Sequence, residues 1–317
     1  MSLALRFRPA NWPSPRRGVE TGPVTLTQRR VYVLPTRAGF LFAGTVLVML
    51  LGCINYNLGL GYVLMFLLSG VGIVSMLHTF RNLAQLQLRP GRPDPVFAGD
   101  DAGFPVLLVN GGGLGRFSVG LTSPHLEPLY VDVPPHQTSI ATLRVPTRRR
   151  GRLRLGRIRI FTTFPLGLFV AWSNVELDLQ CLVYPPPEPG RVPLPAPSPG
   201  DAEGLEMAQG QDDFAGLRKY QPGDSLRHVA WKAVARGQAV MTKQFSGLAA
   251  GELWLDWGNL PHDLLVEARL SRLTRWVLEA TRAGYTFGLR LPAVVIAPGA
   301  GPAHQEQCLT ALALFDA

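Results

Sequence analysis

The apolar positions of the chain divide it into regions of different periodicity, and the first region lies at residues 38–77. This run contains no charged residue and is interrupted only by Asn-Tyr-Asn at 55–57. One membrane-spanning helix needs about 20 apolar residues, and the run is about twice that long. It therefore predicts two transmembrane helices, roughly 38–54 and 58–77, joined by a short turn. The alternatives are a buried core hairpin and a cleaved signal peptide, but core helices are rarely apolar on every side and signal sequences are far shorter.

The charged residues on either side of this run predict its orientation. Residues 1–37 carry seven arginines against one acid, Glu20, and three more arginines lie between 81 and 92. Because Lys and Arg are retained on the cytoplasmic side, we expect residues 1–37 to be a basic cytoplasmic segment. Both ends of a hairpin spanning 38–79 then lie inside, and much of the chain's +9 net charge faces membrane lipid.

Short β-branched runs separated by Gly, Pro and Asn follow the hairpin. They are "FPVLLVN" at 104–110, "SVGLTS" at 118–123 and "SIATLRVPT" at 139–147. Such runs predict an antiparallel, Ig-like β-sandwich over residues 85–184. The sequence "NGGGLG" at 110–115 lacks the Gly-Lys-Ser/Thr ending of a phosphate loop, so a hairpin turn is the favoured interpretation.

Arginine alternates with Leu at 152–155 and, after Gly156, with Ile at 157–160. The change of phase predicts a bulge or turn at Gly156, because one inserted residue moves every later side chain to the other face. We interpret the arginine row as the solvated face of a sandwich near the membrane. A grip on nucleic acid or on lipid head groups is the alternative.

A change of composition marks the next boundary. Residues 185–199 contain eight prolines and an acidic stretch follows, so 185–213 is predicted to be a linker. Residues 214–317 then alternate between strand and helix. A strand is predicted at 251–257, a helix at 264–283, a strand or hairpin at 286–298 and a closing helix at 303–315. This alternation favours an α/β domain with a doubly wound, parallel sheet.

The stretch "YQPGDSLRHVAWKAVARG" at 220–237 predicts a turn followed by an amphipathic helix. Asp224 can cap this helix, and Trp231 lies at the edge of its apolar face. Three interpretations stay open: a helix docked in the core, a site for anions or nucleic acid, and a surface that binds another protein. The basic face consists of Arg227, His228, Lys232 and Arg236.

The motifs of common enzymes do not occur in this sequence. There is no Gly-x-Ser-x-Gly elbow, His-Glu-x-x-His, Cys-x-x-Cys or Walker loop, and the three cysteines and six histidines are scattered. Asp224 is the one candidate for a catalytic acid or base, and the sequence shows no second catalytic residue to act with it. We therefore expect a protein that is not an enzyme and carries no cofactor.

The segment "GLRKYQPGDSLRHVAWKAVARGQAVMTKQF" at 216–245 resembles the signature of the bacterial family catalogued as domain of unknown function 58. The segment "RRGRLRLGRIRIFTTFPLGLF" at 149–169 and the two-helix anchor are also similar to that family. The matching signature residues are Arg218, Tyr220, Pro222, Gly223, Asp224, Trp231, Lys232, Lys243 and Phe245.

This resemblance implies a protein of the bacterial inner membrane whose C-terminal domain is similar to von Willebrand factor type A domains. It further implies a MoxR-type AAA+ ATPase as partner, with a membrane transglutaminase-like protein as a second candidate. The function expected is a non-enzymatic adaptor in protein-complex assembly or maturation. The alternatives are a membrane-tethered binder of nucleic acid or anionic ligands, with nucleic acid the less favoured partner, and, more weakly, a hydrolase centred on Asp224.

One departure from type A domains bears on metal binding. Their metal-binding motif is Asp-x-Ser-x-Ser, whereas the matching residues 256–260 here read Asp-Trp-Gly-Asn-Leu. Asp256 is retained, but both serine hydroxyls, which are the oxygen ligands that a hard cation prefers, are missing. We therefore expect no metal at Asp256.

Overall fold

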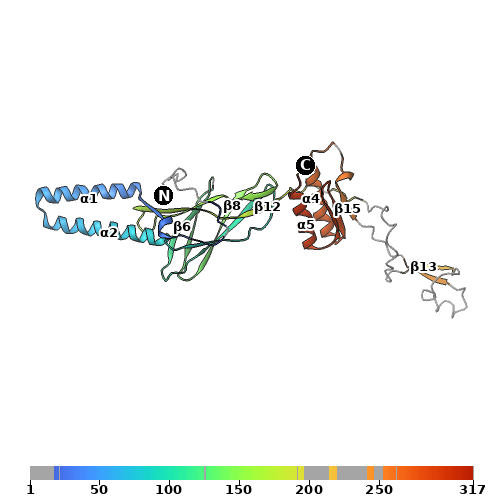
Figure 1. Ribbon diagram of the computed structural model, residues 1–317, viewed down its shortest axis with the longest axis horizontal. Coiled ribbons are helices and arrows are strands. Elements are labelled where there is room, and N and C mark those ends of the chain that lie inside the picture. Colours follow the sequence, from blue (N-terminus) through green and yellow to red (C-terminus); the bar gives the residue numbers. More distant parts are fainter. Residues whose placement is uncertain are drawn as a thin grey trace. The chain divides into compact units, whose positions relative to one another are not determined.

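The computed structural model of the chain forms two compact units, Met1–Pro186 and Pro187–Ala317, which are described separately below (Figure 1). The structure describes residues 18–20, 22–124, 126–190, 192–195, 214–219, 241–245, 253–261 and 263–316, with only the backbone for 214–219 and 241–245.

Two long apolar helices form the hairpin predicted from the sequence. They are α1 (Arg37–Tyr56) and α2 (Gly59–Leu83), and both are long and apolar enough to cross a membrane. Asn57 ends α1 in a left-handed conformation with φ of 50°. Only 11% and 17% of the most apolar window of each helix is buried, which argues against the core hairpin of a soluble protein. We call α1 and α2 the membrane hairpin. Its second helix extends beyond the predicted end to Leu83.

The remainder of the first unit contains β-strands in three sheets and a short 3-10 helix at Gln28–Arg30. All pairs are antiparallel except β4 with β12, which is parallel. The first sheet contains, in order, β1 (Val24–Thr25), β3 (Gln87–Pro90), β5 (Asp101–Val109) and β8 (Thr138–Pro146). The second contains β2 (Tyr32–Pro35), β11 (Phe169–Glu176), β10 (Arg157–Thr162), β6 (Arg116–Thr122) and β7 (Leu129–Val133). The third contains β4 (Val96–Phe97), β12 (Gln180–Tyr184) and β9 (Gly151–Arg154).

A single hydrophobic core joins these three sheets. Strand β5 shows how the sequence determines the inner face, because every second residue from Ala102 to Leu108 is buried. This is the period of two that an antiparallel strand with one covered face requires. Ile158 and Ile160 of β10 and Cys181 of β12 reach the same core from the other sheets.

The chain before the membrane hairpin is also part of this β-domain. Strand β1 pairs with β3 at the edge of the first sheet, and β2 pairs with β11 at the edge of the second. Val24, Leu26 and Val31 are buried in the common core. Residues 24–35 thus contribute two strands to the β-domain, whereas the sequence predicts that all of 1–37 is a basic cytoplasmic segment. The membrane hairpin is therefore an insertion between β2 and β3 of a single β-domain.

The chain passes from one sheet to another at both of the predicted turns. The glycine-rich loop at 110–115 connects β5 to β6, which belong to different sheets, so the prediction of a hairpin turn is wrong. The buried Asn110 holds this loop by donating hydrogen bonds to the carbonyls of Leu114 and Pro134. Gly156, with φ of 73°, likewise lies where the chain passes from β9 in one sheet to β10 in another.

The second unit contains a three-stranded sheet with two helices. The strands are β15 (Leu253–Asp256), β16 (Phe287–Arg290) and β17 (Val295–Gly299), and the helices are α4 (Val266–Arg282) and α5 (Pro302–Ala313). Strands β15 and β16 are parallel and connected through α4, whereas β17 returns antiparallel. Figure 1 shows α4 and α5 side by side on one face of this sheet. The α/β character is confirmed, but within the described residues the sheet is mixed rather than parallel, and both helices lie on the same face. A separate antiparallel pair is formed by β13 (Phe214–Lys219) and β14 (Met241–Phe245).

Candidate functional site

Hydrogen bonds join both helices of the membrane hairpin to the β-domain, and we call the residues that form them the junction. Thr36 precedes α1, and its hydroxyl accepts a hydrogen bond from the amide of Gly39, which caps the helix. The same hydroxyl donates to the carbonyl of Gly167 at 2.6 Å, and the Thr36 amide donates to Leu168 at 2.8 Å. The first turn of α1 is thereby fixed to the loop between β10 and β11.

Asn82 provides the corresponding attachment for α2. Its side chain is buried, donates to the carbonyl of Phe117 at 2.7 Å and to the hydroxyl of Thr162 at 2.9 Å, and accepts from the Phe117 amide at 2.9 Å. These partners lie at an irregularity in the pairing of β6 with β7, where Ser118 has φ of 49°. Asn82 therefore satisfies backbone groups that the sheet leaves free at this position.

The loop between β10 and β11 completes the attachment. The hydroxyl of Thr79 on α2 donates to the carbonyl of Phe164 at 2.8 Å, and the Phe164 ring lies 5.1 Å from that of Phe117. The peptide bond between Phe164 and Pro165 is cis. The "FPLGLF" segment, which carries part of the family resemblance, thus forms the contact between the sandwich and the membrane hairpin.

The arginine row predicted from the sequence is divided between two sheets. Arg152 and Arg154 are exposed on β9, and Arg157 is exposed on β10. Arg159 is buried and donates to the Asn174 side chain at 3.1 Å, so the prediction of a solvated face is wrong for this residue. Burial and the positive charge of Arg157 lower the pKa of the Arg159 guanidinium.

Most of the predicted signature residues lie outside the described part of the chain. Arg218 is in β13 and pairs with Thr242, while Lys243 and Phe245 are in β14 opposite Leu217 and Phe214. The following residues fall in ranges that the structure does not describe: Tyr220, Pro222, Gly223, Asp224, Arg227, Trp231, Lys232 and Arg236.

Asp256 lies at the carboxyl end of β15 with contacts to both of its oxygens. Oδ1 accepts a hydrogen bond from the Gly258 amide at 2.8 Å, and Oδ2 lies 3.3 Å from a guanidinium nitrogen of Arg290. That guanidinium also lies 4.6 Å over the ring of Trp254. An arginine thus balances the carboxylate charge that a metal ion would otherwise balance. Across the described ranges, no three His, Cys, Asp or Glu side chains come together in a group that could hold a metal ion.

His304 and Cys308 are the nearest approach to a catalytic pair in the described second unit. The Nε2 atom of His304 lies 2.7 Å from the carbonyl oxygen of Phe287, to which it donates, and 3.6 Å from the Cys308 sulfur. Because Nε2 carries its proton for that carbonyl, it cannot take one from the thiol. Burial raises the pKa of Cys308 to about 12, so the thiol stays protonated and unreactive at neutral pH.

Part of the predicted proline-rich linker packs on α4. The Arg272 guanidinium donates to both carboxylate oxygens of Glu188, at 2.7 and 3.0 Å. Arg275 donates to the Glu188 carbonyl at 2.7 Å, and the Trp276 indole donates to the carbonyl of Pro193 at 3.0 Å. These bonds fix the start of the second unit to its longest described helix.

Replacing Glu188 with glutamine is expected to reduce the stability of the second unit by about 1 kcal/mol at neutral pH. The hydrogen bonds from Arg272 hold the pKa of Glu188 below its ordinary value of 4.5. A lowered folded-state pKa stabilises the fold above the ordinary pKa, and this contribution disappears as the pH falls through the lowered one. Thermal unfolding of the full chain in detergent should show the difference at pH 7 and its progressive loss as the pH falls below the ordinary pKa of 4.5.

The matched control for this measurement is Glu306→Gln, because Glu306 is exposed on α5. It should leave the midpoint of unfolding unchanged over the same pH range. A Glu188→Gln effect that does not diminish at any pH below 4.5 at which the chain stays folded would show that the carboxylate charge is not what stabilises this contact.

The residues of the junction were not found from the sequence. Of these residues, only Thr36 could have been recognised, since a threonine directly before an apolar helix is a common cap. Asn82 and Thr79 bond to loops distant in sequence, so local pattern gives no sign of their role.

A search for known proteins found no matching family model and no matching curated protein.

Proposed function

We propose that this chain is a non-enzymatic adaptor of the bacterial inner membrane that works with a MoxR-type AAA+ ATPase in the assembly or maturation of a protein complex. A membrane transglutaminase-like protein is the second partner that we propose. Both partners follow from the resemblance of residues 149–169 and 216–245 to the family of domain of unknown function 58. The sandwich is proposed to be Ig-like and the second unit to be similar to type A domains.

The observation that carries the adaptor function is the insertion of the membrane hairpin between β2 and β3. Because strands on both sides of the hairpin belong to one β-domain, the hairpin anchors a folded body rather than a flexible tail. The bonds of Thr36 and Asn82 fix that body to both helices. Such an anchor suits a protein that presents a binding domain at the membrane surface.

The proposed similarity to type A domains has its own support in the second unit. The β15–α4–β16 unit is a parallel pair with a helical crossover, as in α/β domains. Asp256 lies at the carboxyl end of β15, where the metal motif of type A domains would begin. Its contact with Arg290 is in keeping with a domain that docks partners without a metal ion.

The test is affinity capture of the full chain from detergent-solubilised membranes of its source organism, with ATP present. Lys232→Glu with Arg236→Glu reverses two charges on the predicted basic helix, and Arg152→Glu with Arg154→Glu makes the same charge change on β9. We expect the unaltered chain and the β9 variant to retain a MoxR-type ATPase and the helix variant to lose it. Retention by the helix variant would place the contact elsewhere, and absence of the ATPase from the unaltered chain would contradict the proposal.

Binding of nucleic acid or another anionic ligand is the second candidate function, supported by the exposed Arg152, Arg154 and Arg157. The two functions differ in their response to salt. Binding to phosphates should weaken linearly with the logarithm of salt concentration, whereas an apolar interface anchored by Trp231 should not. Capture of nucleic acid alone, lost above about 0.2 M salt, would favour this second function.

A further inference from the structure

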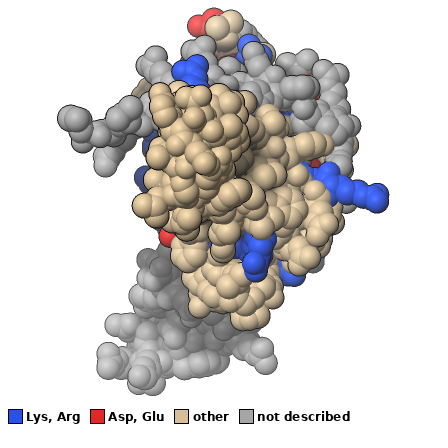
Figure 2. Space-filling view, turned by 90° about the vertical axis from the view of Figure 1, so that its left-hand side faces the viewer, with Lys and Arg blue, Asp and Glu red and all other residues tan. Residues whose placement is uncertain are grey.

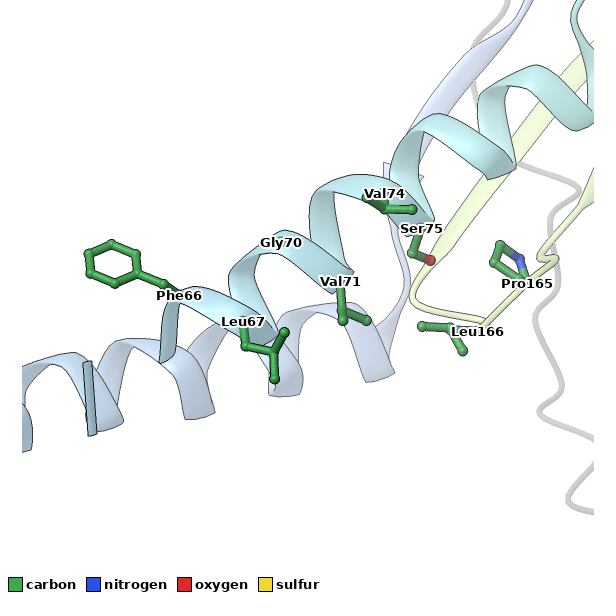
Figure 3. Close-up of a pocket in the computed structure, with 8 residues that line it drawn as sticks. All are labelled: Phe66, Leu67, Gly70, Val71, Val74, Ser75, Pro165 and Leu166. Atoms are coloured by element: carbon green, nitrogen blue, oxygen red, sulfur yellow. The ribbon is translucent and has the colours of Figure 1, made fainter. Parts of the chain in front are cut away.

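A groove of about 530 Å³ opens between α2 and the loop that joins β10 to β11 (Figure 3). Gly70, Val71 and Val74 of α2 form one wall, and Pro165 and Leu166 of the loop form the other. The lining is almost entirely apolar, and Leu166 is 55% exposed. An exposed leucine beside a membrane-spanning helix is favourable only where lipid or protein covers it.

The inner end of the groove contains one polar group without a partner. Ser75 is buried, and its hydroxyl has no hydrogen-bond partner among the described residues. Figure 3 shows this hydroxyl pointing towards Pro165, across the groove. An unsatisfied hydroxyl at membrane depth is unfavourable, because no water is present there to accept its hydrogen bond.

The wall of the groove continues along α2 to a basic residue. Val74 and Arg81 are seven residues apart, which places them on the same side of a helix and about 10 Å apart along its axis. Arg81 is exposed in the last turn of α2, which also contains Asn82. The groove therefore leads from membrane depth to a cation at the level of the sandwich.

A second arginine, Arg116, lies near Arg81, because the next residues along the two segments, Phe117 and Asn82, are hydrogen-bonded to each other. Arg116 of β6 is half-buried, and both its burial and the positive charge of Arg81 lower the pKa of its guanidinium. The Nε atom of Arg116 is buried without a hydrogen-bond partner within the described structure, and neither arginine forms an ion pair there. Two adjacent cations, one of them partly desolvated, favour an anion between them. Seen from the tip of the hairpin, basic side chains surround its base (Figure 2).

We propose that the groove and the Arg81–Arg116 pair form a binding site for an anionic phospholipid. One acyl chain lies in the groove against Gly70, Val74 and Leu166. The phosphate lies between the two guanidinium groups, and an ester carbonyl of the glycerol accepts the hydrogen bond of Ser75. This site goes beyond the proposed adaptor function and depends only on insertion of the hairpin in a membrane.

A lipid fits these features better than a helix from a second copy of the chain. An apolar helix could cover Leu166, but an identical chain would bring a further copy of the same arginines and leave both cations without a counter-charge. Free phosphate would neutralise the arginines but leave the groove open. Only an anionic lipid satisfies the apolar wall, the hydroxyl and the two charges together.

The test uses the full chain in detergent, with native mass spectrometry to count bound phosphatidylglycerol and phosphatidylcholine across a titration. We expect the unaltered chain to prefer phosphatidylglycerol. Arg81→Gln with Arg116→Gln should weaken phosphatidylglycerol binding about 25-fold, since each basic residue at an anionic surface contributes a factor of about five. Binding of phosphatidylcholine should not change, and Arg152→Gln with Arg154→Gln should match the unaltered chain.

A second variant tests the groove without changing a charge. Gly70 has no neighbour within 4 Å of the position where a side chain would begin, so Gly70→Leu should fold normally and fill the groove. It should weaken binding of phosphatidylglycerol, whereas Gly44→Leu, with equally open surroundings on α1, should not. Equal binding of the two lipids by the unaltered chain would overturn the proposal, as would displacement of phosphatidylglycerol by millimolar inorganic phosphate. A dimer that Gly70→Leu dissociates, without bound lipid, would assign the groove to a second copy and overturn it too.

Discussion

Replacing Asn82 with alanine is expected to lower the free energy of unfolding of the first unit by about 3 kcal/mol or more. The substitution removes three hydrogen bonds, one of them buried, and leaves the amide and carbonyl of Phe117 without their partner at a partly buried position. Each buried polar group left unsatisfied costs about 1–3 kcal/mol. In thermal unfolding of the full chain in detergent, the midpoint should fall by about 6–12 °C.

The control for this change is Asn55→Ala, which removes the same side chain from an exposed position in the last turn of α1. Its midpoint should stay within about 1–2 °C of the unaltered chain. If Asn82→Ala behaves like Asn55→Ala, Asn82 does not hold α2 to the sandwich, and the junction must depend on other contacts.

Replacing Gly39 with alanine is expected to destabilise the first unit by about 2 kcal/mol. A methyl group at this position would meet the carbonyl oxygen of Leu168 closer than real side chains approach a backbone. The helix and the loop must therefore separate, which weakens the hydrogen bonds between Thr36 and the loop. Alanine favours helices more than glycine does, so a loss of stability cannot come from helix propensity.

The matched variant is Gly44→Ala on the same helix, where no atom lies within 4 Å of the added methyl group. It should be neutral or slightly stabilising in the same thermal measurement. Gly39→Ala matching Gly44→Ala in stability would mean that α1 does not contact the loop closely, and that the hairpin is joined to the sandwich only through α2.

The sequence was sufficient where periodicity is strong and runs are long. The uncharged run at 38–77 predicts both helices, and the β-branched run at 104–110 predicts a strand that corresponds to most of β5. The helix at 264–283 and the closing helix also correspond to α4 and α5. In each of these segments the burial of its own side chains determines the structure, so local pattern is informative.

The sequence was insufficient where pairing joins distant segments. Strands β1 and β2 have two and four residues, too few to show a period, and Tyr32 pairs with Trp172. Their role in the sandwich therefore could not be found from residues 1–37 alone. The loop after β5 looked like a hairpin turn because glycines allow one, but bonds from Asn110 to Val133 and Pro134 direct the chain to another sheet.

The most direct test of the central claim is the side of the membrane on which residues before and after the hairpin lie. In a chain with its three native cysteines replaced by alanine, single cysteines are introduced as Arg29→Cys, Asn57→Cys and Glu127→Cys, all at exposed positions. Each is labelled with a membrane-impermeant maleimide in spheroplasts, before and after permeabilisation. An insertion between β2 and β3 predicts that Arg29→Cys and Glu127→Cys react together, and the proposed cytoplasmic orientation predicts that they do so only after permeabilisation, whereas Asn57→Cys reacts before it. Reaction of Arg29→Cys and Glu127→Cys from opposite sides would contradict a single β-domain interrupted by the membrane hairpin, and reaction of both from outside would contradict its cytoplasmic placement.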